Sequence, residues 1–207
     1  MSDKQSILIG YSGHGFVVAE AAMENGVKII GYADRVPVSV NPFKLDYLGV
    51  ENAVDFSGWD MDVSFMLGVG DNAIRYKLAN LVKDKNKNLL TVISKSASVS
   101  QSAEIGNGVF INRNAAVNAL AKIGNYVLLN TGCIVEHECI LGDAVHIAPG
   151  AIIAGNVKVG ERTFIGANSV VKQGVTIGKD VVIGAGSVII HDIPDGKKVV
   201  GNPGKYI

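Results

Sequence analysis

The stretch AEIGNGVFINRNAAVNALAKIGNYVLLN, residues 103–130, carries an aliphatic side chain at every sixth position, beginning with Ile105. The same step of six continues in both directions without an insertion, from Val99 to Ile189, and all sixteen positions hold Val, Ile or Leu. The residue two places before each aliphatic is always Ala, Val, Cys, Thr or Ser. A strict six-residue period is typical of a parallel β-helix built from hexapeptide repeats.

The period predicts how each hexapeptide sits in such a helix. Residues two apart on a strand share a face, so the small and the aliphatic residue both point inward. Three hexapeptides would close one triangular coil, and successive coils would stack their aliphatic residues into a continuous core. Cys133 and Cys139 fall at small inward positions, which favours buried structural thiols over redox groups. We expect the Gly or Asn after many aliphatics to take the unusual backbone angles of the corners: Gly106, Asn112, Gly124, Gly142, Gly160, Gly166, Gly178 and Gly184.

Residues 1–90 have a different pattern, in which apolar strands alternate with helical periodicity. Strands are expected at SILIG, VKIIGYAD and MDVSFMLGVGDN, and helices at FVVAEAAMENG and AIRYKLANLVKDKN. This alternation predicts a small parallel sheet with Rossmann-like winding. We therefore expect a Rossmann-like α/β domain in residues 1–90 and a β-helix domain in residues 91–207.

The turn from Gly10 to Gly15, GYSGHG, lies between the first strand and the first helix. Such a turn presents backbone N–H groups and a helix N-terminus to a phosphate. Its glycines follow steps of three and two, unlike the dinucleotide fingerprint, so a mononucleotide or nucleotide-sugar site fits better. Asp34 ends the second strand, where it could accept hydrogen bonds from a ribose or base. The alternatives are a turn that needs glycine only for its geometry and an Asp34 that only caps the strand.

Composition excludes several classes of function. The chain of 207 residues has 19 basic and 19 acidic residues and no formal net charge, which argues against a nucleic-acid or membrane surface as its main partner. Two cysteines are too few for a disulfide scaffold. The N-terminal segment MSDKQSILIG lacks the apolar region of a signal peptide, and no apolar run is long enough to span a bilayer. We expect a cytoplasmic protein without membrane insertion.

Two of the four histidines lie nine residues apart in the repeat. His137 falls on the corner after the inward Val135, whereas His146 lies between the inward Val145 and Ile147 and points outward. Because a coil has about 18 residues, nine residues carry the chain about half-way round it. The two side chains therefore cannot meet within one chain, and they can share a site only if a second copy packs alongside. The register predicts a cyclic homo-oligomer with sites between subunits.

Two chemistries could use such histidines. The γ-class carbonic anhydrases are β-helix proteins that bind zinc with three histidines, but here the third candidate, His191, falls far along the axis. We therefore expect no metal. A general base fits better, because histidine titrates near neutrality and can take a proton from an attacking amine or hydroxyl. Either Glu136 or Glu138 could orient His137.

Taken together, several motifs resemble the bacterial sugar O- and N-acetyltransferases: GYSGHG, Asp34, LGVGDN, EHEC, VHIAPGA and VVGNPGK. The resemblance covers nearly the whole chain and is strongest to nucleotide-linked amino-sugar N-acetyltransferases, such as those acting on UDP-4-amino sugars in bacillosamine synthesis. The sialic acid O-acetyltransferases are similar. The resemblance implies a left-handed β-helix, a homotrimer, acetyl-CoA in the groove between two β-helices, and a nucleotide-linked amino sugar on the N-terminal domain.

The resemblance also implies roles for single residues. His137 would be the general base, Glu138 would raise its basicity, and His146 of a neighbouring subunit would contact the acetyl group. The backbone at Ala167 and Ala185 would contact the CoA arm. The nucleotide-sugar pocket would be lined by Ser12, Gly13, His14, Asp34, Arg35 and Gly70.

The sequence thus predicts acetyl transfer from acetyl-CoA to the amino group of a nucleotide-linked sugar, for bacterial glycan biosynthesis. The acceptor amine would attack the thioester directly, with His146 or a backbone N–H stabilising the oxyanion. One alternative is O-acetylation of a sialic acid or related sugar. The other is a β-helix that only scaffolds a complex and does not bind acetyl-CoA.

Overall fold

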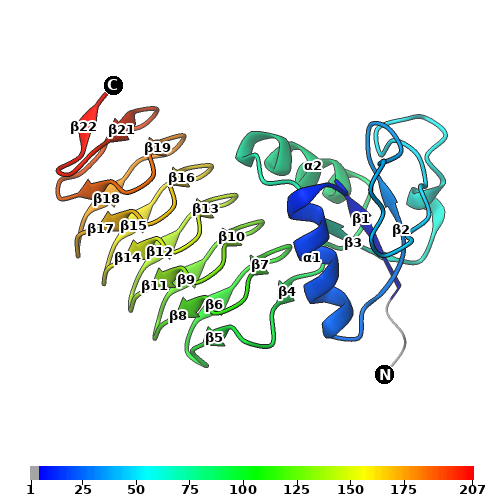
Figure 1. Ribbon diagram of the computed structural model, residues 1–207, viewed down its shortest axis with the longest axis horizontal. Helices are drawn as coiled ribbons and strands as arrows, with labels where there is room; N and C mark the ends of the chain where they lie inside the picture. The colour runs from blue at the N-terminus through cyan, green and yellow to red at the C-terminus, as the bar shows by residue number, and fades with distance from the viewer. Residues whose placement is uncertain (1–4) are drawn as a thin grey trace.

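A computed structural model describes residues 5–207, which form a small α/β domain followed by a long three-sided β-helix (Figure 1). The α/β domain lies against the first coils, and the remaining coils extend away from it. Both halves of the predicted fold are thus confirmed, although the first four residues of the expected N-terminal domain lie outside the described part. No helix of residues 5–207 is long and apolar enough to cross a bilayer, and the cytoplasmic location stays a prediction.

The N-terminal domain contains a parallel sheet of order β2-β1-β3. Its strands are β1 (Gln5–Ile9), β2 (Lys28–Ala33) and β3 (Ser64–Leu67), its helices are α1 (Gly13–Glu24) and α2 (Asn72–Asp84), and η1 (Ser57–Asp60) is a short 3-10 helix. Asp71 caps α2 by accepting a hydrogen bond from Ile74 N at 2.9 Å, which satisfies one of the free N–H groups of the first turn. The strand–helix alternation is the Rossmann-like winding expected from the sequence.

In the β-helix, each short strand from β4 to β17 pairs with the strand 18 residues further on. The eight-stranded face holds β4 (Val92–Ile93), β7 (Phe110–Ile111), β10 (Leu128–Leu129), β13 (His146–Ile147), β16 (Phe164–Ile165), β19 (Val182–Ile183), β21 (Lys198–Val200) and β22 (Lys205–Tyr206). The six-stranded face holds β5 (Ser98–Val99), β8 (Ala116–Val117), β11 (Ile134–Val135), β14 (Ile152–Ile153), β17 (Val170–Val171) and β20 (Val188–Ile189). The five-stranded face holds β6 (Glu104–Ile105), β9 (Lys122–Ile123), β12 (Ile140–Leu141), β15 (Lys158–Val159) and β18 (Thr176–Ile177). All neighbouring strands are parallel except β21 and β22, so three hexapeptides do close one coil.

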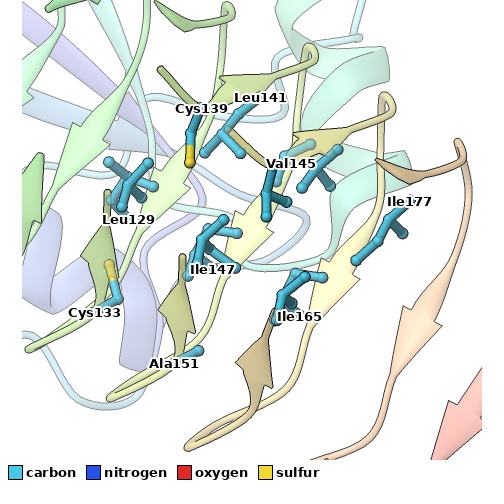
Figure 2. Close-up of a cluster of buried hydrophobic side chains, with 14 of the residues drawn as sticks. Leu129, Cys133, Cys139, Leu141, Val145, Ile147, Ala151, Ile165 and Ile177 are labelled. Carbon is cyan, nitrogen blue, oxygen red and sulfur yellow. The ribbon is translucent and has the colours of Figure 1, made fainter. Parts of the chain in front are cut away.

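The aliphatic residues of successive coils form the predicted column. Leu129, Ile147 and Ile165 are fully buried and follow one another along the eight-stranded face (Figure 2). Cys133 and Cys139 point into the same core and are not joined by a disulfide. Burial raises the pKa of Cys133 to about 12, so its thiol stays protonated and is a poor nucleophile. The structural assignment of the cysteines is confirmed.

The corners differ from the prediction. Positive φ angles occur at the third residue after each inward aliphatic from Ile105 to Ile183, as at Gly108, Glu138 and Gly150, and not at the first. The glycine at the first position has another reason. A Cβ on Gly106 would lie 2.7 Å from the backbone of Gly124 in the next coil, so glycine there lets successive coils stack closely.

The N-terminal domain completes its core on the β-helix. Phe110 and Leu128 point outward from the eight-stranded face and are buried in one cluster with Val18 and Ala22 of α1. This packing brings α1 and the first turn of α2 against the eight-stranded face, where His146 lies.

Candidate functional site

The corner between β11 and β12 carries His137 and Glu138 side by side. His137 Nδ1 lies 3.1 Å from Glu138 Oε2, and both side chains are about half exposed. Because a carboxylate oxygen accepts, this partner assigns the ring proton to Nδ1 and leaves Nε2 as an acceptor. The sequence left Glu136 and Glu138 as alternatives, and the structure pairs His137 with Glu138.

The backbone of Glu138 accounts for this contact. Neighbouring side chains on a strand point to opposite sides, but Glu138 has a φ of 60°, which turns the chain and brings its carboxylate beside the preceding ring. The same left-handed conformation occurs at Ala144 and Asn156, at the corresponding positions of later corners. The His–Glu contact therefore uses a turn that the coil makes at every corner of this kind.

His146 lies on a different side of the coil, in β13 of the eight-stranded face. It points outward from the β-helix core, as predicted, but it is only 9% exposed, because the N-terminal domain covers it. Its Nδ1 lies 3.3 Å from the carbonyl oxygen of Gly70, and its ring packs edge-on against Phe164 with 5.1 Å between centroids. The structure does not bring His146 and His137 together within one chain.

The side-chain amides of Asn112 and Asn130 determine the hydrogen bond at the other ring nitrogen of His146, Nε2. Asn130 Oδ1 accepts hydrogen bonds from Asn112 Nδ2 at 3.0 Å and from Thr131 N at 2.8 Å. This orients Asn130 Nδ2 toward His146 Nε2, at 3.4 Å. A carbonyl at Nδ1 and an amide donor at Nε2 both require the neutral Nδ1–H tautomer.

Arg75 of α2 is fully buried beside His146 and joins the two domains. Its guanidinium donates to the carbonyl oxygens of Gly70 at 2.9 Å, Tyr126 at 2.8 Å and Ala144 at 2.7 Å. Burial lowers its pKa to about 9, so it is charged at neutral pH. It thereby holds the Gly70 loop against two successive coils of the β-helix.

The same burial keeps two histidines uncharged. The pKa of His146 is lowered to about 4, first by burial and then by the positive charge of Arg75. The pKa of His14 is lowered to about 4 for the same two reasons. At neutral pH both rings are neutral, in agreement with the tautomer that the hydrogen bonds assign to His146.

The glycine turn borders a pocket of about 420 Å³ that Tyr11, Ser12 and Gly13 share with residues 36–40. The turn itself needs glycine at Gly10, which has a φ of 86°, and at Gly15, where a Cβ would clash with the carbonyl oxygen of Gly10. It does not need glycine at Gly13, because a Cβ there would meet nothing within 4 Å and the φ of Gly13 is not positive. Glycine at this position leaves the N-terminus of α1 open to a ligand.

The other predicted residues of the nucleotide site, Asp34, Arg35 and His14, lie in three different environments. Asp34 Oδ2 accepts a hydrogen bond from Tyr11 N at 2.9 Å, and Oδ1 accepts one from Arg35 N at 2.7 Å, so Asp34 does serve as a cap for the turn. Arg35 is exposed. The ring of His14 turns away from the Ser12 pocket and packs edge-on on Phe110, and its Nε2 has no hydrogen-bond partner within residues 5–207.

Gly70 borders a second groove, of about 510 Å³, in front of His146. Like Gly13, Gly70 has an open Cβ position and no positive φ, so the fold does not require glycine there. Asp71, Asn72 and Arg162 line the same groove. Arg162 bonds Asp180 through two nitrogens, at 2.7 and 2.8 Å.

Ala167 and Ala185 occupy equivalent corners of successive coils, between the eight-stranded and six-stranded faces. Gly186 N donates to the carbonyl oxygen of Ala167 at 2.8 Å, and Asn168 N donates to that of Pro149 at 2.9 Å. Pro149, Ala167 and Ala185 therefore form a strip of small residues beyond His146. Within residues 5–207, no group of three or more His, Cys, Asp or Glu side chains is placed to hold a metal ion.

The sequence did not predict two residues of this region, Asn130 and Arg75. Asn130 looked like any other polar corner residue. Arg75 lies on the buried face of α2 together with Ala79 and Val82. A charged residue on that apolar face was the feature of the sequence that could have identified it.

The fold agrees with that of solved proteins. The acetyltransferase domain of PglB from Neisseria gonorrhoeae, in complex with acetyl coenzyme A, is 36% identical, with a TM-score of 0.92 and 100% of each chain covered. PerB from Caulobacter crescentus, in complex with CoA and GDP-perosamine, is 35% identical, with a TM-score of 0.92 and 98% of this chain and 97% of that one covered. A curated relative, the UDP-N-acetylbacillosamine N-acetyltransferase of Bacillus subtilis, is 33% identical over 110 residues. That alignment covers 52% of this chain and about half (51%) of the relative.

Sequence families divide the chain as the structure does. Residues 6–82 match the PglD N-terminal domain, residues 120–155 match the bacterial transferase hexapeptide (six repeats), and residues 156–190 match the hexapeptide repeat of succinyl-transferase. The three-sided hexapeptide coil and the two repeat matches define the class, a hexapeptide-repeat transferase. Within that class, the chain belongs to the family of sugar N-acetyltransferases that includes the PglB acetyltransferase domain and PerB.

Proposed function

We propose that this protein transfers the acetyl group of acetyl-CoA to the amino group of a nucleotide-linked amino sugar. The observation that carries the proposal is the His137–Glu138 pair, in which Glu138 occupies Nδ1 and leaves Nε2 free at a half-exposed corner. The relatives named above support both substrates: PerB is described with CoA and GDP-perosamine, and the B. subtilis protein is named for a UDP-linked sugar.

The chemistry needs one base and one oxyanion donor. The neutral amine attacks the thioester carbonyl, so a C–N bond forms, the C–S bond breaks, and His137 Nε2 takes the proton that the amine loses and passes it to the departing thiolate. Glu138 stabilises the imidazolium formed in between. In His146, Nε2 carries no proton and can only accept, and the single N–H of the ring, at Nδ1, is bonded to the carbonyl oxygen of Gly70. We therefore assign the oxyanion to a backbone N–H, and His146 to the wall of the acetyl pocket.

We propose that the active unit is a homotrimer. From β8 to β20, the outward residues of the six-stranded face are apolar and half-buried. The outward residues of the five-stranded face are exposed and mostly polar: Glu104, Lys122, Ile140, Lys158 and Thr176. The apolar set is Ala116, Ile134, Ile152, Val170 and Val188. A continuous apolar stripe of this kind favours packing against a second copy. Such packing would place the His137 corner of one chain near the His146 groove of its neighbour, with the CoA arm along the strip of Ala167 and Ala185.

We propose that the nucleotide part lies at the Ser12–Gly13 turn and that the sugar reaches the Gly70 groove. The two glycines that the fold itself does not require, Gly13 and Gly70, border these two places. In this arrangement the backbone N–H groups at the start of α1, including that of His14, face the phosphates, while Asp34 and Arg35 border the ribose and base.

The test measures thiol release from acetyl-CoA with purified protein and a panel of UDP- and GDP-linked 4-amino sugars and free sialic acids. We expect turnover with an amino sugar nucleotide, and we expect His137→Ala to lower kcat by at least 100-fold while the trimer mass persists in light scattering. Turnover with sialic acids alone would replace N-acetylation by O-acetylation. Near-normal activity of His137→Ala would remove the base assignment, and absence of acetyl-CoA binding by calorimetry would leave a scaffold.

A further inference from the structure

The ring of His137 lies against Gly155, the corresponding corner residue of the next coil. A Cβ placed on Gly155 would be 2.5 Å from both Cε1 and Nε2 of His137 and 3.2 Å from its Nδ1. Asn156 N donates to the carbonyl oxygen of His137 at 2.8 Å, which ties the two corners together directly. The ring thus occupies the space where any other residue would carry its side chain.

We infer that Gly155 is a positioning residue for the reaction: it reserves the space that holds the His137 ring with Nε2 directed toward the substrates. The inference rests on the proposed role of His137. Glu138 holds the ring at Nδ1, and the bare backbone of Gly155 supports the edge that carries Cε1 and Nε2. Two supports on different edges leave the imidazole one orientation.

The backbone does not require glycine at this position. Gly155 has no positive φ, in contrast to Gly150 and Gly174, which occupy third corner positions with φ of 69° and 76°. The second corner position is glycine at residue 155 and at no other corner from 101 to 191. Its occupants, in chain order, are Gln101, Asn107, Arg113, Ala119, Asn125, Thr131, His137, Asp143, Pro149, Gly155, Glu161, Ala167, Gln173, Lys179, Ala185 and His191.

The residue at the equivalent position of the preceding coil also has a small side chain. Ala119 lies one coil before His137, and Glu138 N donates to its carbonyl oxygen at 3.0 Å. The catalytic imidazole is therefore flanked along this column by the two smallest residues, Ala119 and Gly155. The next coil returns to a long side chain, Gln173, whose exposed position has no ring to accommodate.

The consequence of one added methyl group follows from these distances. A carbon–carbon contact at 2.5 Å is far inside the normal separation of about 3.5–4 Å, and the backbone of Gly155 is held by its hydrogen bond from Gly174 N at 3.0 Å. The ring has to move, which lengthens its bond to Glu138 and redirects Nε2. A displacement of about 1 Å of a catalytic group costs on the order of 10²-fold in rate.

Gly155→Ala tests the inference by steady-state kinetics. We expect kcat to fall about 10- to 100-fold while the KM for acetyl-CoA stays within twofold, because the alanine keeps the backbone of the corner and changes only the orientation of the base. A kcat within twofold of the unmodified protein would overturn the inference.

A double-variant cycle with His137→Ala separates a ring contact from a general need for glycine. We expect Gly155→Ala to lower the melting temperature when His137 is present and to leave it unchanged when residue 137 is alanine. If Gly155→Ala alone does not fold, the double variant is still expected to fold like His137→Ala. An equal fall in both backgrounds, or a double variant that does not fold, would show that glycine serves the coil itself and would overturn the inference.

The cycle also distinguishes this inference from the proposed function. If His137→Ala retains normal activity, the base assignment fails, and the melting temperatures still report whether the ring and Gly155 share the space. If His137→Ala is inactive but the cycle shows no coupling, the proposed function stands and the role of Gly155 fails.

Discussion

The two domains of this chain are stabilised in different ways. In the β-helix, each coil packs on the coil before it and the coil after it, and the core column from Val109 to Val199 is composed of β-helix residues alone. The N-terminal domain has a sheet of only three strands within the described residues, and one of its two clusters borrows Phe110 and Leu128 from the eight-stranded face. The β-helix thus supplies part of the core of its neighbour, whereas the neighbour supplies none of the β-helix column. We expect perturbations at the joint to release the N-terminal domain and leave the coils intact.

Acidification should have the largest effect on this joint. His14 and His146 have pKa values lowered from 6.5 to about 4 in the folded protein, so the unfolded state binds more protons between these values and stability falls as the pH drops from about 6.5 to 4. A shift of about 2.5 pKa units corresponds to roughly 3 kcal/mol for each histidine. Above pH 6.5 both states are neutral at these rings and no loss is expected. Hydrogen exchange at pH 7 and pH 5 should show loss of protection in α1 and α2 before any loss in the coils.

The controls for acidification are His14→Gln and His146→Gln. Each removes one of the two titrating rings, so each should flatten the fall in stability between pH 6.5 and 4 by about half. A fall of unchanged size in both variants, or equal loss of protection in both domains, would contradict the assignment.

Arg75→Met should have the next largest effect, at neutral pH. The substitution removes the buried guanidinium. It leaves the carbonyl oxygens of Tyr126 and Ala144 without a donor and that of Gly70 with His146 Nδ1 alone, at 3.3 Å, which costs about 3–5 kcal/mol. We expect a separate, earlier unfolding transition of the N-terminal domain in calorimetry, while the transition of the β-helix is retained.

Arg113→Met is the matched control, because Arg113 also crosses the joint, bonding Glu20 and Glu24 of α1 at 2.8 and 2.6 Å. It does so at the surface, where such pairs contribute about 0–1 kcal/mol. A similar loss from both arginines would mean that bridging the joint, and not burial, sets the size of the effect.

The same contrast decides how much could be predicted from the sequence. In the β-helix a residue's place follows from its count along the repeat, so the inward Cys133, the outward His146 and the corner position of His137 were all predicted correctly. The positive φ was placed at the wrong residue of the corner, because glycine occurs at the first position for close stacking, as at Gly106, and that requirement looks the same in a sequence as a demand for unusual backbone angles.

What the repeat could not predict came from contacts between the domains. Counting placed His146 on an outer face but could not show that Gly70 and Arg75 bury it. The glycine turn of residues 10–15 was predicted as a ligand-binding loop, but His14 packs on Phe110, more than 90 residues away in the chain. Such contacts depend on how two domains dock, and no local pattern in the sequence records that.

Glu138→Gly should have the smallest effect on stability, and it sharpens the rule that position dictates conformation in the β-helix. Glu138 adopts a φ of 60° because the corner demands it, which costs a residue with a side chain about 1 kcal/mol relative to glycine. We therefore expect the variant to gain about 1 kcal/mol, or about 2–4 °C in melting temperature, while acetyl transfer falls because His137 loses its partner.

Glu138→Gln keeps the strain and removes the charge, so it should lose activity without any gain in stability. Leu120→Gly, in the preceding coil with a φ of 61° and a side chain 58% exposed, should match the gain in melting temperature. Loss of stability in both glycine variants would mean that the corner does not impose the left-handed conformation, and that the contact between His137 and Glu138 must hold the turn itself.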